Sequence, residues 1–159
     1  MKFLGVLATL LLSLSASASI LGTWQGSGSL TEDLDGVVQN YKCSEVQFEV
    51  LEENEEIIIR MDTRGTNCGD SLNYHFGEIN YGIRGSTLYK YSAKMGKISD
   101  TEINAQDRMC FMTRPCEYWD HVSAKLNEVG DLVLNLNFDD YSTSTWKNKF
   151  QIVLKRVNK

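Results

Sequence analysis

The residue types that could carry chemistry are few, and their spacing argues against catalysis. Asp120 and His121 are adjacent and Ser123 follows two residues later, which superficially offers an acid–base triad. The surrounding residues alternate between apolar and polar, as in a β-strand, where neighbouring side chains point to opposite faces. Asp120 therefore cannot orient His121, and the sequence contains no Gly-x-Ser-x-Gly elbow. We expect no catalytic residues and no enzyme activity.

The histidines and the acidic runs predict neither a cofactor nor a metal ion. Strand parity places both His75 and His121 on the face away from the apolar residues. A haem held inside the fold would need an inward-facing histidine, so we expect none. The acidic residues at 52–56 and 139–140 lack the glycine and the ligand spacing of a calcium loop. Solvated turns that block edge-to-edge association account for them.

The four cysteines favour two disulfides. Cys43 and Cys68 flank a hairpin that is predicted to turn near Asn54, while Cys110 and Cys116 enclose a short loop containing the single proline. No Cys-x-x-Cys pair is present, which disfavours a four-thiolate zinc site. Of the three possible pairings, we expect Cys43–Cys68 and Cys110–Cys116.

Apolar and aromatic residues at one strand parity are the candidate ligand-binding residues. Tyrosines on such a face offer an apolar wall and a hydroxyl that orients a ligand. The alternative is an interior filled by its own side chains, and the sequence leaves both open. The candidate wall residues are Phe48, Ile59, Tyr74, Phe76, Tyr118, Leu134 and Leu136.

These residues belong to segments with a period of two. Apolar residues alternate with polar ones in five runs, and turn signals such as Asp35-Gly36 and Gly85-Ser86 lie between such segments. No segment longer than ten residues shows a helical stripe. The pattern predicts an all-β fold, an antiparallel up-and-down β-barrel of 8–10 strands, because a closed barrel removes exposed edges. The five runs cover residues 46–50, 57–61, 72–76, 132–138 and 150–155.

The N-terminus and the composition bound the class of protein. Residues 1–18 combine Lys2, an uncharged apolar run and Ala16-Ser17-Ala18, which predicts a signal peptide cleaved near Ala18. We therefore expect one domain at 19–159, secreted or periplasmic, with no transmembrane span in the mature chain. The formal net charge of −5 disfavours a nucleic-acid partner.

The start of the predicted domain carries a family resemblance. Leu21-Gly22-Thr23-Trp24-Gln25-Gly26-Ser27-Gly28 places Gly-x-Trp on the first strand and resembles the calycin group, which includes lipocalins and fatty-acid-binding proteins. The extended motif is also similar to the opening of nitrobindin-type haem barrels. The resemblance implies a lipocalin-like barrel in which Trp24 closes the floor and Arg156 lies across its ring. The chain lacks the lipocalin helix before the last strand and the second lipocalin motif.

Two functions follow as expectations. The first is an exported lipocalin-like barrel that binds a small apolar or amphipathic ligand without catalysis. The second is a secreted interaction or inhibitor module with a packed barrel, whose disulfide-tied loop 110–116 presents Phe111, Met112 and Arg114 to a protein partner.

Overall fold

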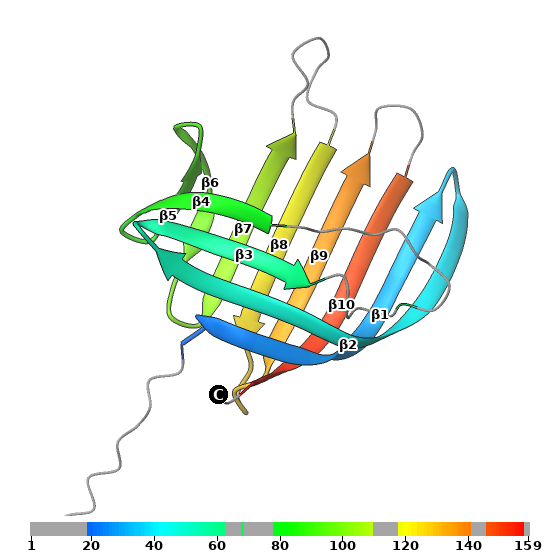
Figure 1. Cartoon of the computed structure of the whole chain (residues 1–159). Coiled ribbons are helices and arrows are strands. Elements are labelled where there is room, and N and C mark those ends of the chain that lie inside the picture. The colour runs from blue at the N-terminus through cyan, green and yellow to red at the C-terminus, as the bar shows by residue number, and fades with distance from the viewer. Residues whose placement is uncertain (1–18, 63–67, 69–77, 110–117, 141–145, 158–159) are drawn as a thin grey trace, which may run out of the picture.

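The computed structural model describes residues 19–62, 68, 78–109, 118–140 and 146–157, apart from a few side chains at strand ends. These residues form ten β-strands connected in chain order (Figure 1). The strands are β1 (Gly22–Leu34), β2 (Val37–Glu53), β3 (Glu56–Asp62), β4 (Glu78–Arg84), β5 (Thr87–Lys90), β6 (Ala93–Ile98), β7 (Glu102–Met109), β8 (Tyr118–Leu126), β9 (Leu132–Asp140) and β10 (Trp146–Arg156).

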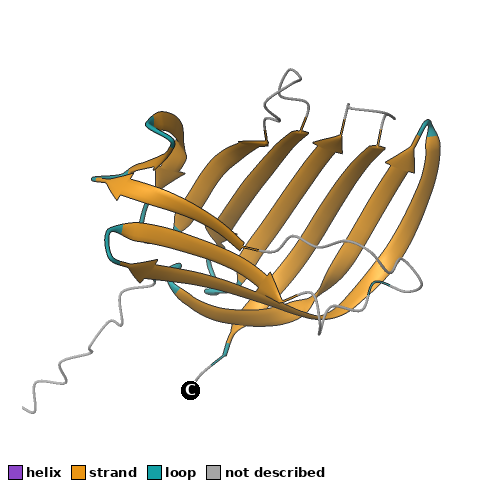
Figure 2. Ribbon diagram, turned by 45° about the horizontal axis from the view of Figure 1, so that its top comes forward, coloured by secondary structure: helices purple, strands orange, loops and turns teal. Residues whose placement is uncertain are grey.

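The strands close into a single antiparallel up-and-down barrel. Each strand pairs with its neighbours in the chain, and β1 pairs with both β2 and β10 to complete the wall. The described residues contain no helix, and the strands curl around one common axis (Figures 1 and 2). The all-β barrel of 8–10 strands predicted from the sequence is confirmed.

Alternation and turn chemistry explain these elements. In β9 the side chains of Leu132, Leu134 and Leu136 are buried, while the residues between them are only half-buried. Two-residue turns join the longest strands: Asp35 and Gly36 connect β1 to β2 with positive φ angles of 52° and 86°. Such turns match the right-handed twist of the strands they join.

Two glycines let β1 lie unusually close to β10. A Cβ atom added at Gly26 would lie 2.1 Å from the Val153 carbonyl oxygen, and one at Gly28 would lie 2.0 Å from that of Gln151. No residue with a side chain fits at that distance. The register between β1 and β2 also shifts between Gly26 and Gly28, which is where a strand bends most easily. The glycines of the opening motif therefore allow the barrel wall to curve.

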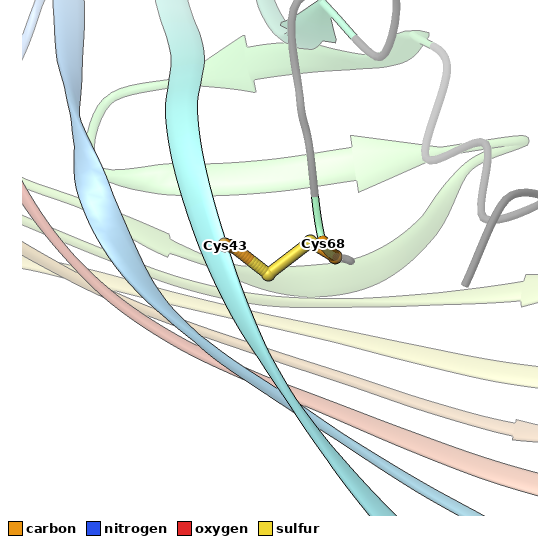
Figure 3. Close-up of a disulfide and its surroundings, with 2 residues drawn as sticks. All are labelled: Cys43 and Cys68. Carbon is orange, nitrogen blue, oxygen red and sulfur yellow. A yellow bond between two sulfur atoms is a disulfide. The ribbon is translucent and has the colours of Figure 1, made fainter. Parts of the chain in front are cut away.

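One disulfide joins β2 to residue 68. The Cys43 and Cys68 sulfur atoms are 2.05 Å apart, and both residues are buried (Figure 3). This confirms the predicted Cys43–Cys68 pair, and such a bond is consistent with an oxidising compartment. Cys110 and Cys116 lie outside the described residues.

Removal of this disulfide is expected to destabilise the barrel. The bond links residues 25 positions apart, and a cross-link of that span restricts the unfolded chain. We expect Cys43→Ala/Cys68→Ala to lower the free energy of unfolding by about 2–4 kcal/mol. Urea unfolding followed by circular dichroism measures this, and an unchanged unfolding midpoint would contradict it.

Candidate functional site

The floor of the barrel is built around Trp24. Its side chain is buried, and its Nε1 donates a hydrogen bond of 2.9 Å to the Ile20 carbonyl oxygen. The Arg156 guanidinium lies 4.4 Å from the centre of the indole ring. Arg156 also donates hydrogen bonds to the carbonyl oxygens of Leu21 and Ser19. The cation therefore holds the segment before β1 against the ring.

Gly22 makes room for that arginine. Its φ angle of 136° lies in a region that side chains rarely adopt, and an added Cβ would lie 2.7 Å from Arg156 Nη1. The Gly-x-Trp motif thus has a physical basis in this chain: the glycine leaves space for the guanidinium that covers the tryptophan two residues later.

The interior above the floor is organised in rows of directly paired residues that share a face of the sheet. The Leu30 row is apolar and fully buried at each position. Its members are Leu30, Phe150, Leu136, Val122 and Ala105. Together with the rows beneath, it forms one continuous hydrophobic cluster that reaches down to Trp24. The described side chains of this part of the interior are apolar and buried from solvent.

The next row along the strands contains polar residues in place of apolar ones. Glu32 pairs with Asn148, and the same line of pairs continues through positions 138 and 120 to Asp107. We call Glu32, Asn148 and Asp107 the polar row. Asp107 and Asn148 are each only 3% exposed, so polar groups are buried here directly above the apolar cluster. Burial of such groups is costly unless they are hydrogen-bonded.

Asp107 is held by a lysine from another part of the wall. Lys90 Nζ lies 2.5 Å from Asp107 Oδ2, and the lysine side chain keeps a quarter of its surface exposed. The β6–β7 ladder ends at the pair Gly96 and Ala105, two residues before Asp107. The ion pair therefore ties the β5–β6 hairpin to β7 beyond the last backbone pairing.

Asn148 presents a buried acceptor. No donor among the described residues lies within hydrogen-bond distance of its Oδ1 atom. A buried amide oxygen left in that condition costs about 1–3 kcal/mol, so native proteins contain few of them. Its register partner Glu32 is half-buried, with the Tyr41 hydroxyl 3.5 Å from Oε2. An acceptor and a carboxylate thus lie side by side on the inner wall.

The structure places the predicted wall residues at different depths. Leu136 is in the Leu30 row, Leu134 is one row deeper, and Phe48 pairs with Trp24 at the floor. Ile59 is buried in the same cluster. Tyr74 and Phe76 lie outside the described residues, as does loop 110–116. Tyr118 begins β8, but its side chain is not described.

The polar row was not predicted as a site, although the signal for it was present. Asn148 and Asp107 lie two residues from Phe150 and Ala105, at the same strand parity. Continuing the alternation by one step would have placed polar groups on the inner face. The lysine that pairs with Asp107 has no such signal, because it lies 17 residues away on another strand.

The outer wall carries His121. The residue is exposed and borders a cleft of about 460 Å³ that Asn137, Asn148 and Lys149 also line. Within the described ranges, no three His, Cys, Asp or Glu residues are grouped so as to hold a metal ion. The same part of the chain includes no helix with the length and apolar character needed to cross a bilayer.

Comparisons with known proteins add no relative. The chain matches no model of a known protein family, no curated protein and no solved structure. The closed barrel of ten antiparallel strands is consistent with a calycin-like barrel. The polar row above an apolar core and the floor at Trp24 are therefore the features from which a function can be inferred.

Proposed function

We propose that this chain is an exported, non-catalytic barrel that binds a small amphipathic molecule at the polar end of its interior. The observation that carries the proposal is the change from the apolar Leu30 row to the polar row within one step along the strands. A ligand lying across this boundary would contact apolar side chains on one side and buried polar groups on the other. A small number of convergent polar groups beside an apolar surface is typical of small-molecule sites.

The apolar part of the ligand supplies most of the binding energy in this proposal. Leu30, Phe150 and Leu136 form the top of the core and would receive it, at roughly 25 cal/mol per Å² of apolar surface removed from water. The polar row would fix the ligand's orientation. The disulfide between Cys43 and Cys68 supports export, since such bonds persist in oxidising compartments.

Titration calorimetry with octan-1-ol, a compact neutral amphiphile, tests the proposal. We expect saturable one-to-one binding with a negative heat-capacity change, because apolar surface is buried. Leu136→Asn keeps the side-chain size but places an amide in the Leu30 row, and it should weaken binding about tenfold or more. Val153→Asn is the matched control, since Val153 lies on β10 with half of its surface exposed.

Two results would overturn the proposal. One is the absence of saturable binding by the folded wild-type protein. The other is equal affinity in wild type and a folded Leu136→Asn variant, which would place the ligand elsewhere.

A further inference from the structure

A cleft on the outer wall, over β4, has features that the barrel itself does not require. Its volume is about 680 Å³, which lies in the range of small-molecule sites. The β2–β3 turn, the β5–β6 turn and the strand β4 all contribute to its lining. We call it the β4 cleft, and the lining residues that matter below are Glu55, Glu56, Asn80, Gly82, Arg84 and Tyr91.

Gly82 leaves the base of the β4 cleft bare without a reason in packing. It lies inside β4, where it pairs with Glu56 on one side and Tyr89 on the other. A Cβ atom added at Gly82 would have no neighbour nearer than 3.8 Å, and its φ angle is not positive. A glycine inside a strand weakens the strand, and it often marks a place where another molecule approaches the backbone. Gly82 therefore provides an open base for a ligand.

Two turns that line the β4 cleft carry residues that suit them poorly. Two-residue hairpin turns with positive φ angles favour Asn, Asp and Gly. The β5–β6 turn instead has Tyr91 and Ser92, at φ angles of 50° and 67°, and the β2–β3 turn has Glu55 at 66°. A bulky side chain in this conformation costs conformational energy, and such strain is concentrated at functional sites.

The Tyr91 side chain is presented to solvent rather than to the barrel. It is 90% exposed, and its described contact is Lys90 Nζ, which lies 5.9 Å from the ring centre. Burial in the core therefore does not account for a tyrosine in this turn. An aromatic ring held at the edge of an open cleft offers a flat apolar surface to a ligand.

We propose that the β4 cleft binds a neutral sugar ring of a glycan, which packs on Tyr91 and lies over Gly82. A sugar ring has an apolar face of C–H groups that fits an aromatic ring, and its hydroxyl groups both donate and accept hydrogen bonds. The cleft supplies both kinds of partner, since carboxylates accept, guanidinium groups donate and the Asn80 amide does both. This site lies on the outer wall and does not depend on the proposed interior site.

The charges of the β4 cleft disfavour a strongly charged ligand. Among the described residues no cation is paired with the carboxylate of Glu55 or Glu56, so both would repel an anion. Arg84, whose guanidinium lies 5.1 Å from the centre of the Tyr89 ring, would repel a polycation. A cleft with both signs of charge thus selects against either charged polymer.

Calorimetric titration of the full folded protein tests the proposal. The ligands are the neutral hexasaccharides of maltose, cellobiose, chitin and mannan type, with hexalysine and hexaglutamate as charged peptides for comparison. We expect saturable binding of at least one hexasaccharide, and binding of both peptides that is at least about tenfold weaker. The proposal is overturned if no hexasaccharide binds, or if a peptide binds more tightly than every hexasaccharide.

Gly82→Val locates the sugar at the base of the cleft. Valine favours strands and nothing crowds an added Cβ atom, so we expect the variant to fold and to keep the wild-type urea midpoint or exceed it. Its side chains would occupy the base and should weaken hexasaccharide binding about tenfold or more. Ser123→Val places the same side chain on the outer face of β8 and should leave the affinity unchanged. Equal affinity in wild type and folded Gly82→Val protein would overturn the proposal.

Tyr91→Asn separates binding from folding. Asparagine suits a positive φ angle, so the variant should be at least as stable as wild type but should bind the hexasaccharide about tenfold more weakly. Tyr91→Phe keeps the ring and should retain affinity to within about threefold. Asp35→Asn is the matched control, because Asp35 holds the same position in the β1–β2 turn with a φ angle of 52°. A Tyr91→Asn protein that binds as tightly as wild type would place the sugar elsewhere and contradict the assignment.

Discussion

Trp24→Ala is expected to lower the free energy of unfolding by about 3–5 kcal/mol, the range for removing a large buried aromatic side chain. The indole is 1% exposed and is the largest fully buried side chain among the described residues. Its loss would also remove the hydrogen bond to the Ile20 carbonyl and the ring that Arg156 covers. Urea unfolding followed by far-ultraviolet circular dichroism measures the change without relying on tryptophan fluorescence.

Two variants separate the parts of this effect. Trp24→Phe keeps an aromatic ring beneath Arg156 but has no N–H, so we expect a smaller loss than for alanine. Val129→Ala removes an apolar side chain that is 80% exposed, and it should change the unfolding free energy by less than about 0.5 kcal/mol. A Trp24→Ala protein as stable as the Val129→Ala protein would contradict the role of the floor.

The architecture was predictable because its signals are local. A period of two and short turn sequences predict a strand even when the strand that pairs with it is unknown. The described residues form ten strands. The Cys43–Cys68 pair followed from the hairpin at Asn54, because counting out from that turn sets Cys43 opposite roughly residue 65, a few residues before Cys68. Such features depend on residues close in the chain or related by one turn.

The contacts of Arg156 show a different limit. Its position over Trp24 was expected from the calycin resemblance, and the structure places the guanidinium there. Its hydrogen bonds to the carbonyl oxygens of Ser19 and Leu21 were not expected. Every residue has a backbone carbonyl group, so the amino-acid sequence does not show which of them accepts a hydrogen bond from Arg156.

The polar row was missed for a physical reason. Apolar residues are the signal that a sequence gives for an interior, and Asn148 or Asp107 near the end of a strand is typical of a solvated position. Their burial depends on closure of the barrel, which sets strands from both ends of the chain beside each other. The partner of Asp107 comes from β5, across β6, and no periodicity connects the two residues.

The ion pair between Lys90 and Asp107 leads to the second large prediction. Lys90→Met is expected to lower the free energy of unfolding by about 3–5 kcal/mol, because it takes the cation away from a buried carboxylate. The Asp107 side chain is only 4% exposed, so its carboxylate has little contact with water. The loss should appear in urea unfolding and as weaker protection of β5 and β6 amides from hydrogen exchange.

A double-mutant cycle distinguishes the ion pair from simple loss of packing. If the buried charge causes the destabilisation, Lys90→Met should cost much less when Asp107→Asn has already removed that charge. Lys125→Met is the surface control: Lys125 lies 3.6 Å from Glu102 with both side chains well exposed, so we expect a change below about 1 kcal/mol. Equal costs of Lys90→Met in the two backgrounds would mean that the lysine stem, and not its charge, holds the β5–β6 hairpin against β7. The pair would then be a packing contact, and the inner wall would need no cation to keep Asp107 buried at the edge of the polar row.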